Sequence, residues 1–267
     1  EECMSEDKSL AMFLALSGAK KFIAVCIDNN SSKFSYGKQF RQRNADKEIV
    51  MLPIDKLGKP DYSFMEQYIS QKENTLRKRY IKYLENQLYL LGEVVEIDPL
   101  SEKKWKEFFV SDIFATPKRG KRITSRNYIE GDIPIVSSAG SNNGVIAFAG
   151  NKDGIRIYED CLSVANGGVS AGYAFYHPYK FIATDHVTYF KGRNLNKYHY
   201  IFLSTVIRNQ MHQKYDFSRE MTDPRLKREK LLLPVDERGT PDFDYMEQYI
   251  KNIMIAKYRD YFSKNGN

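Results

Sequence analysis

Apolar side chains recur with helical spacing in two long segments of the chain, residues 64–91 and 245–262. In each segment the intervals are mostly three, four or seven residues, and lysines and arginines take much of the opposite face of the first. Two such stripes most simply bury each other, so we predict an antiparallel helical pair. The alternative is that each stripe packs on its own globular domain. The residues assigned to helix packing are Met65, Ile69, Leu76, Leu88, Met246, Ile250 and Ile253.

Both predicted helices have recognisable starts. Pro60 and Asp61 form a turn, and Ser63 precedes Glu66 by the three residues of a capping box. Asp244 and Glu247 repeat this spacing at the second helix. We therefore expect Ser63 and Asp244 to cap the two helices.

The two helices follow two copies of one sequence. Met51–Ile69 (MLPIDKLGKPDYSFMEQYI) and Leu232–Ile250 (LLPVDERGTPDFDYMEQYI) align without a gap at an offset of 181 residues. Solenoid repeats have periods of roughly 20–50 residues, so this repeat indicates two large, similar modules. A duplicated chain suits a target with two halves, such as double-stranded DNA.

The segment between the helices alternates short β-rich runs with Gly, Asn, Ser and Asp clusters. The runs are followed by a helical stretch near 197–212, a loop of mixed charge and a strand that enters 231–234. This spacing predicts a curved, mostly antiparallel sheet with a few helices. The predicted strands are 133–136, 145–148, 155–158, 173–176 and 186–190.

The first fifty residues resemble the last third of that module. Residues 9–26 match its helical stretch, and residues 36–50 run without a gap into the first repeat. Nothing before them matches residues 102–190. We therefore expect this chain to be the carboxy-terminal portion of a longer protein or a natural truncation.

Composition narrows the class of partner. The formal net charge is +7 with a pI near 9.0, which favours a polyanionic partner without proving one. Three scattered cysteines, Cys3, Cys26 and Cys161, favour a reducing compartment over a disulfide framework. The chain holds no apolar run of 18 residues and its acidic start resembles no signal peptide, so we predict a cytoplasmic location.

The order of these segments resembles the specificity (S) subunit of Type I restriction–modification systems. It is also similar to the matching subunits or domains of Type IIB and Type IIG enzymes. The resemblance rests on the entry WKEFFVSDIF at 105–114, on GDIPIVSS at 131–138, and on the exit KLLLPVDERGTPDF at 230–243.

That resemblance implies a fold class of α/β (α+β) type, in which a β-rich target recognition domain is flanked by two long helices packed as an antiparallel coiled-coil-like pair. It implies a remnant of a first recognition domain at 1–50, a conserved region with a spacer helix at 51–101, a second recognition domain at 102–231 and a second conserved region at 232–267. Each recognition domain of the family reads one half of a split DNA site. The implied partners are double-stranded DNA, methyltransferase (M) subunits and possibly a restriction (R) subunit, with possible self-association through the helices.

Three segments of the second module are candidate DNA contacts. A basic stretch without acidic residues can reach phosphates and guanine edges, and small polar side chains suit close approach and Asn–adenine pairing. Solvated loops are the alternative for each. The candidates are Lys118, Arg119, Lys121, Arg122 and Arg126 in the first segment, Ser138, Asn142 and Asn143 in the second, and Arg219, Arg225, Lys227 and Arg228 in the third.

No catalytic, cofactor-binding or metal-binding residue is predicted. The four histidines lack metal-ligand spacing with cysteines, and no glycine-rich cofactor loop with an Asn/Asp-Pro-Pro-aromatic motif is present. We predict that the chain recognises a DNA sequence and is not an enzyme. Two rivals stay open: a protein-interaction scaffold built on the paired helices, and a module that binds polysaccharide or peptide.

Overall fold

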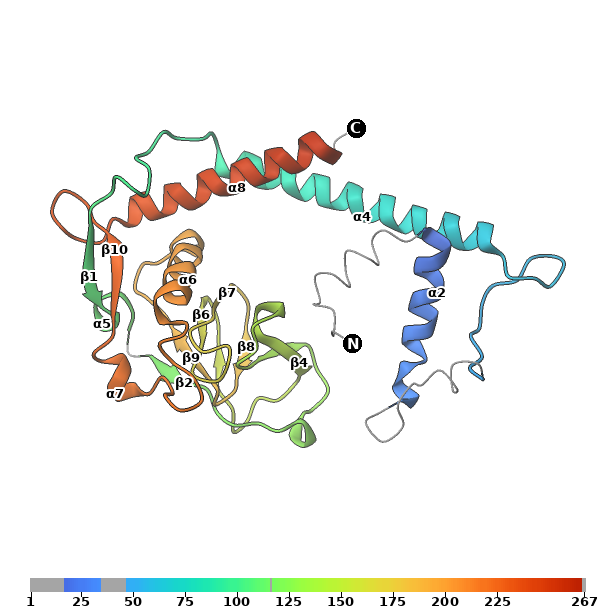
Figure 1. Ribbon diagram of the computed structural model, residues 1–267, viewed down its shortest axis with the longest axis horizontal. Helices are drawn as coiled ribbons and strands as arrows, with labels where there is room; N and C mark the ends of the chain where they lie inside the picture. Colours follow the sequence, from blue (N-terminus) through green and yellow to red (C-terminus); the bar gives the residue numbers. More distant parts are fainter. Residues whose placement is uncertain (1–16, 35–46, 116, 266–267) are drawn as a thin grey trace. The chain divides into compact units, whose positions relative to one another are not determined.

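The structure, a computed structural model, describes residues 17–34, 47–115 and 117–265. These residues fall into two compact units, an N-terminal unit that ends at Leu90 and a C-terminal unit, Leu91–Asn265 (Figure 1). In the described part of the chain no helix is long and apolar enough to cross a membrane.

In the N-terminal unit a short helix packs against a long one. Helix α2 (Gly18–Asn29) is followed by the 3-10 turn η1 (Ser31–Lys33), and helix α4 runs over Tyr62–Leu91. The contact includes an edge-on pair of Phe22 and Tyr68, whose ring centroids lie 5.6 Å apart. Lys21 also reaches Glu73 at 2.7 Å.

The C-terminal unit combines a two-stranded ladder with two four-stranded sheets. In the ladder β1 (Trp105–Phe109) runs antiparallel to β10 (Lys230–Pro234). The sheets have the strand orders β2-β9-β6-β7 and β4-β3-β8-β5, and all their pairings are antiparallel except β3–β8. The strands are β2 (Lys118–Arg119), β3 (Ile133–Val136), β4 (Val145–Ala149), β5 (Ile157–Tyr158), β6 (Cys161–Ala165), β7 (Ala174–His177), β8 (Phe181–Ala183) and β9 (Val187–Phe190).

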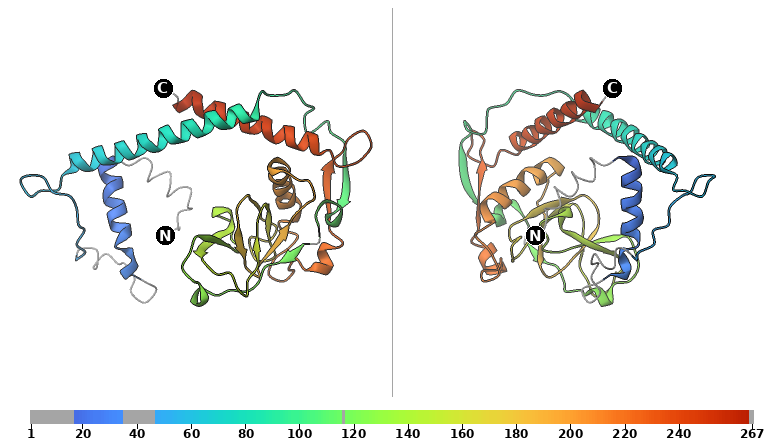
Figure 2. Two further views of the ribbon diagram at one scale, coloured as in Figure 1. Left: turned by 180° about the vertical axis from the view of Figure 1, so that it is seen from behind. Right: turned by 45° about the vertical axis from the view of Figure 1, so that its right-hand side comes forward.

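Helices cover one side of this β-rich part. Helix α6 (Lys197–Met211) lies between β7 and α8 (Phe243–Asn265), as the views in Figures 1 and 2 show. Tyr200 of α6 stacks on Tyr176 of β7 with centroids 5.2 Å apart. Phe202 meets Tyr249 of α8 edge-on at 5.8 Å. The shorter elements are α5 (Val110–Ile113), η2 (Ser125–Asn127), η3 (Asn142–Gly144) and α7 (Asp223–Leu226).

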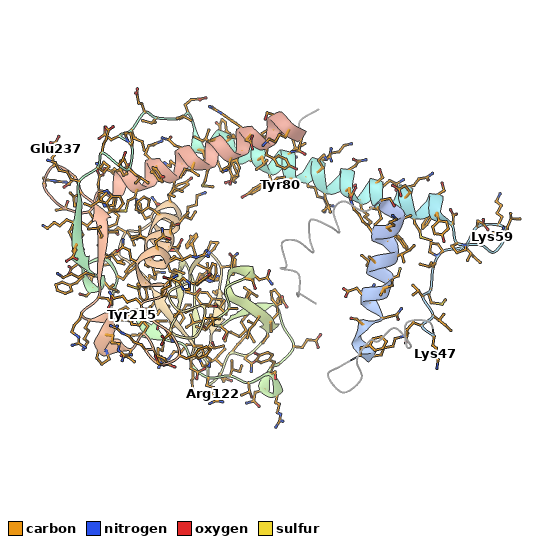
Figure 3. All side chains as sticks on the ribbon, viewed as in Figure 1. Lys47, Lys59, Tyr80, Arg122, Tyr215 and Glu237 are labelled. Atoms are coloured by element: carbon orange, nitrogen blue, oxygen red, sulfur yellow. The ribbon has the colours of Figure 1, made fainter. Side chains whose placement is uncertain are left out.

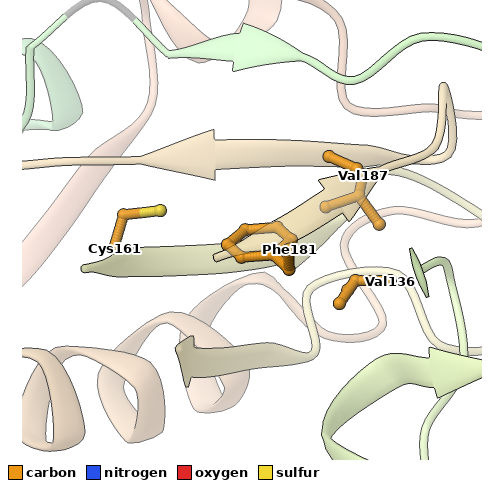
Figure 4. Close-up of a cluster of buried hydrophobic side chains, with 5 residues drawn as sticks. Val136, Cys161, Phe181 and Val187 are labelled. Atoms are coloured by element: carbon orange, nitrogen blue, oxygen red, sulfur yellow. The ribbon is translucent and has the colours of Figure 1, made fainter. Parts of the chain in front are cut away.

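The core lies where the two sheets face each other. Val136, Cys161, Phe181, Ala183 and Val187 form a cluster in which every member is at most 1% exposed (Figure 4). Burial raises the pKa of the Cys161 thiol to about 12, so it stays a protonated, apolar group.

The repeated sequence folds twice into the same junction. Asp61 accepts a bond from the Phe64 amide at 2.8 Å, and Asp242 accepts one from the Tyr245 amide at 3.0 Å. Before each helix the chain makes a tight turn around Gly58 or Gly239, both with φ of 75°. The aspartates therefore start both helices as N-caps.

The predicted capping boxes are wrong as a result. Ser63 and Asp244 lie inside the helices, and the glutamates have another role. Glu66 accepts the amides of Gly18 and Ala19 at 3.1 and 2.8 Å, at the start of α2. Glu66 thus holds the first turn of α2 in place.

Glu247 occupies the equivalent place at the start of α6. Its carboxylate accepts a bond from the Asn196 side chain and lies 3.4 Å from Nε2 of His199. Burial alone raises the pKa of Glu247, but the bonds from Lys251 and Asn196 outweigh it and lower the pKa below its usual value. The carboxylate is therefore ionised where it holds the helix start.

Most predicted elements are confirmed, and the fold is a mixture of helix and sheet. The long helices begin two residues earlier than predicted, and the second ends at Asn265. Strands β6 and β8 were not predicted, because all of their residues are buried and no polar alternation marks them. Pairing of α4 with α8 stays a prediction, as does the division into recognition and conserved regions.

The residues assigned to helix packing differ in burial. Met65 and Met246 are fully buried, and Ile250 is 7% exposed. Leu76 and Ile253 are 62% and 40% exposed. Helix α8 contacts α6 within the C-terminal unit, and the assignment of these residues to packing between the two long helices stays a prediction.

Replacing the central core ring should destabilise the C-terminal unit. We expect Phe181→Ala to lower the free energy of unfolding by about 3–5 kcal/mol, because it removes a fully buried ring and leaves a cavity. The matched control is Phe148→Ala on β4, where the side chain is 60% exposed. Urea unfolding of both variants checks this; equal losses would contradict the core assignment.

Stability should fall in mild acid because of His177. Burial lowers the pKa of His177 from 6.5 to about 4, while its Nε2 lies 2.7 Å from Oγ of Ser163. In the unfolded chain His177 binds a proton below about pH 6.5, whereas in the folded chain it stays neutral down to about pH 4.

The free energy of unfolding should therefore fall by up to roughly 3 kcal/mol between these two pH values. In urea unfolding from pH 7 to 4, His177→Gln should show a shallower decline than the parent chain. His186→Gln is the control, since that side chain is 65% exposed. The same decline in all three proteins would rule His177 out as the cause.

Candidate nucleic-acid interface

Three loops of the C-terminal unit meet and form one surface, which we name the loop face: residues 137–144, 166–172 and 216–221. The Ser138 hydroxyl donates to the Gly167 carbonyl at 2.8 Å and joins the first loop to the second. The Met221 amide donates to the Asn166 carbonyl at 2.7 Å and joins the third. Two of the three segments selected from the sequence thus contribute to one surface.

The central loop, 166–172, is held by internal bonds. The Ala171 amide donates to Gly168 and the Gly172 amide to Ala165, at 3.1 and 3.0 Å. The Asn166 side chain donates to the Asp185 carbonyl at 3.0 Å and accepts a bond from the Thr188 hydroxyl. This loop is therefore a fixed platform and not a flexible tether.

The glycines of that loop permit close packing. A β-carbon at Gly167 would lie 3.0 Å from Cγ of Glu220, and one at Gly172 would lie 2.6 Å from the His212 backbone nitrogen. Gly168 has a φ of 76°, in the left-handed region. The third loop thus lies directly on the backbone of the second.

The third loop is a tight turn closed by Asp216. Its carboxylate accepts the amides of Ser218 and Arg219 at 2.7 and 2.8 Å and the Ser218 hydroxyl at 2.7 Å. The bond from the Ser218 side chain, followed by these amide bonds, lowers the pKa of Asp216. The negative charge of the Asp216 carboxylate is therefore engaged by hydrogen bonds within its own turn.

The first loop owes its shape to two asparagines. Asn142 and Asn143 have φ of 48° and 53°, which a short polar side chain tolerates better than most. Both side chains are exposed, so they stay candidates for base contacts. Ser138 is half-buried and bonded to Gly167, so it serves the loop structure.

The first basic segment divides between structure and surface. Arg119 in β2 is half-buried and donates to Glu220 and to the Met221 carbonyl at 3.2 and 2.9 Å, so it supports the third loop. Its neighbour Gly120 is a packing site. A β-carbon there would lie 2.1 Å from the Thr184 carbonyl oxygen.

The rest of that segment is exposed: Lys118, Lys121, Arg122 and Arg126. Nζ of Lys121 lies about 4.0 Å from the position of a β-carbon at Gly154, so this part of the segment borders the loop after β4. Figure 3 labels Arg122 of this segment and Tyr215, which precedes the third loop. Arg119 supports the loop face from outside it, and we name the four exposed residues the basic surface.

The third basic segment flanks the loop face. Arg219 lies over the Tyr215 ring, 5.6 Å from its centroid. Arg225 is half-buried and donates to the Glu220 carbonyl, while Lys227 and Arg228 are exposed. Exposed cations here are thus Arg219, Lys227 and Arg228.

Charge is distributed unevenly over the module. Residues 102–231 hold 21 Lys and Arg against 13 Asp and Glu, so they carry the excess of positive charge. Within them, residues 133–151 and 161–179 contain no charged side chain at all. Two loops of the loop face are therefore uncharged, and the third carries Arg219.

Aromatic and histidine side chains outside the loops have structural contacts. Tyr173 packs under the Arg208 guanidinium at 4.1 Å, and Tyr176 donates to Asp160 at 2.9 Å. His212 has its Nδ1 2.9 Å from the Ala171 carbonyl oxygen. Among the described residues no group of three or more His, Cys, Asp or Glu could hold a metal ion.

Sequence reasoning gave the central loop too little weight. Residues 165–172 are not among the three candidate segments predicted from the sequence. The signal that could have found them is the absence of charge across 161–179 together with three glycines in a β-rich context. Phe217, at the tip of the third loop, was also missed.

The chain is similar to known proteins. The family model of the Type I restriction modification DNA specificity domain matches residues 102–260. Over 234 residues the chain is 29% identical to the Type II restriction enzyme BgcI specificity subunit S.BcgI of Heyndrickxia coagulans, covering 87% of this chain and 65% of that protein.

Two solved structures are also similar. The S subunit of a Type I restriction–modification system from M. genitalium is 16% identical with a TM-score of 0.43, covering 73% of this chain and 50% of that one. The HsdS subunit from Thermoanaerobacter tengcongensis is 12% identical with a TM-score of 0.40, covering 90% and 62%. The chain thus spans 50–65% of the length of these three relatives.

Because the family model covers more than half of the chain, this protein belongs to the family of Type I restriction modification DNA specificity domains.

Proposed function

We propose that this chain recognises a DNA sequence on behalf of a restriction–modification enzyme. In this proposal the 102–231 module reads one half of a two-part site, the chain itself performs no catalysis, and a methyltransferase subunit carries out the chemistry in the cytoplasm. Membership of the specificity-domain family supports this function. The single structural observation that carries it is the loop face, where two uncharged loops adjoin a third loop that carries the exposed Arg219.

That arrangement suits sequence reading physically. Base edges are recognised by hydrogen bonds at close range, which small polar side chains such as Asn142 and Asn143 permit. Phosphates lie to either side of a groove and are bound by Lys and Arg. Two uncharged loops beside a loop that carries the exposed Arg219 fit this arrangement.

Rigidity adds to specificity. A loop that is already ordered loses little conformational entropy on binding, so more of the contact energy appears as affinity. The bonds of Asp216 and Asn166 hold two of the loops in place before DNA arrives. Mismatched bases therefore meet a surface that does not adapt to them.

The long helices supply the spacing and the docking surface in this proposal. Helix α4 has 30 residues, which corresponds to about 45 Å at 1.5 Å per residue. One helical turn of B-DNA separates half-sites by roughly 34–36 Å. A rod of that length suits a spacer between two recognition modules, and its exposed faces suit methyltransferase (M) and restriction (R) subunits or a second copy of the chain.

DNA binding should depend strongly on salt. We expect this chain alone to bind a random-sequence 30-base-pair duplex with a Kd no better than ~10⁻⁴–10⁻⁶ M at physiological salt, and the affinity to fall steeply as salt rises. A cognate M subunit should tighten binding, because it adds phosphate contacts. Fluorescence anisotropy across a salt series checks both effects. Binding that is indifferent to salt would favour the polysaccharide, peptide or scaffold alternatives.

Alanine substitutions should separate surface cations from structural ones. Lys121→Ala and Arg122→Ala should each lower the salt slope by about one if the side chain contacts a phosphate, with unfolding free energy changed by no more than about 0.5 kcal/mol. Arg119→Ala should instead destabilise the module, because Arg119 holds the third loop through Glu220 and Met221.

Arg238→Ala is the matched control. Its side chain is 86% exposed and lies on the turn before α8, outside the loop face and the basic surface. Salt slopes and urea midpoints are the measurements. If Lys121→Ala, Arg122→Ala and Arg238→Ala are indistinguishable from the parent, the separate basic surface is merely solvated and phosphate binding must come from Arg219, Lys227 and Arg228.

A further inference from the structure

Two large apolar side chains stand out from the loop face. Phe217 is 80% exposed at the tip of the third loop, and Val169 is 81% exposed at the tip of the second. They belong to adjoining turns, because a β-carbon at Gly168 would lie 3.3 Å from Cζ of the Phe217 ring. The aromatic ring thus rests by one edge on a bare glycine while the rest of it faces outward.

Both tips are held rigidly. The turn that carries Phe217 is closed by Asp216, which accepts two amides and a hydroxyl, and by the Asp216 amide donating to the Arg219 carbonyl at 3.2 Å. The turn that carries Val169 is closed by the Ala171 amide donating to Gly168. An exposed ring on a fixed turn is presented to a partner and does not fold back onto its own core.

The other copy of the sequence has residues of the same kinds at the corresponding positions. At the offset of 181, Ser35-Tyr36-Gly37-Lys38 stands opposite Asp216-Phe217-Ser218-Arg219. Both read as a turn-forming residue, an aromatic residue, a small residue and a cation. Residues 35–38 lie outside the described residues, so the comparison concerns sequence alone. It shows that an aromatic residue followed two positions later by a cation is common to both modules.

The surroundings favour a polyanion over an acidic or apolar protein surface. The two acidic groups closest in sequence are already engaged, Asp216 by its own turn and Glu220 by Arg119. Arg219 follows Phe217 by two residues and lies over Tyr215, on the surface. The loops beside the tips carry no charge. An apolar tip with a cation beside it suits a base step next to its phosphate.

We propose that Phe217, with Val169 beside it, is an apolar wedge that enters between adjacent base pairs of the bound duplex. This inference rests on the proposed function and deepens it by assigning the residue that deforms the DNA. The ring replaces part of the stacking between two base pairs, while Arg219 reaches the adjoining phosphate. No covalent step is involved.

Such insertion has a consequence that phosphate binding lacks. A wedge between base pairs partly unstacks and unwinds the duplex, and the cost of this deformation depends on the sequence of the step. Flexible pyrimidine–purine steps are the least costly to open. Phe217 therefore contributes to specificity without reading any base edge.

The test uses a relaxed closed-circular plasmid and topoisomerase I. The full chain, at saturating concentration and low salt, should change the linking number of the relaxed product, because each wedge unwinds its site. Phe217→Ala should abolish most of that change and weaken binding to a 30-base-pair duplex by about tenfold. Phe217→Leu, which keeps an apolar wedge, should retain much of the change, and Val169→Ser should reduce it.

The matched control is Arg219→Ala. It should lower the salt slope by about one while the change in linking number at saturation persists. Urea midpoints of the Phe217 variants should equal that of the parent, because the ring is exposed in the free protein.

The outcomes separate this inference from the proposed function. If the parent chain binds duplex DNA with the expected salt dependence but leaves the linking number unchanged, or if Phe217→Ala changes it as much as the parent does, the wedge is refuted and DNA recognition stands. If the parent binds no duplex DNA at any salt concentration, both are refuted. A tip that serves a protein partner instead would appear as unchanged DNA binding in Phe217→Ala, which also overturns the wedge.

Discussion

Each unit of this chain depends on one carboxylate at the start of a long helix. Glu66 accepts two amides from the first turn of α2, and Glu247 holds Asn196 at the start of α6. The first turn of a helix has amides without intrahelical partners and a partial positive charge, so a carboxylate there stabilises it in two ways. Through α6, this contact helps to set the position of the sheet under Tyr176 relative to α8, together with the packing of Phe202 on Tyr249.

The loop face combines two demands that usually conflict. A recognition surface must be variable in sequence, yet it must be rigid enough to discriminate between similar targets. Here rigidity comes from bonds between backbone groups and a few buried polar side chains, such as Asn166 with Asp185 and Thr188. The exposed positions Asn142, Asn143 and Val169 take no part in those side-chain bonds. The side chain of Val169 is thus free to differ without loss of the loop structure, whereas the φ angles of Asn142 and Asn143 favour short polar residues at those two positions.

The sequence predicted the long helices and most strands because their signals are local. Helical spacing between 64 and 91 needs no knowledge of what covers the apolar stripe. The pairing partner of a charged residue is not local, and this limited the prediction of the site. Arg119 looked like a free cation in a basic loop, yet its partners Glu220 and Met221 lie 101 and 102 residues away.

The capping boxes failed for a similar reason. Ser63 and Glu66 have the correct spacing, but the aspartate two residues earlier competes for the same role and its preceding turn is already set by Pro60. The glutamate is then free to make a tertiary contact that spacing alone does not reveal. Phe217 was missed because a single aromatic residue in a charged segment carries no periodic signal, and its exposure follows from the turn that Asp216 closes.

The matched junctions also bear on how such chains change over generations. Asp61 accepts the amide of Phe64 and donates its own to Pro53, and Asp242 does the same with Tyr245 and Pro234. Every partner in this set lies within the repeated sequence. A genetic crossover inside the repeat would therefore join the strand of one copy to the helix of the other with each bond intact. Under the proposed function, the stretch between the copies is a cassette that one recombination event could replace without redesign of the helix that follows it.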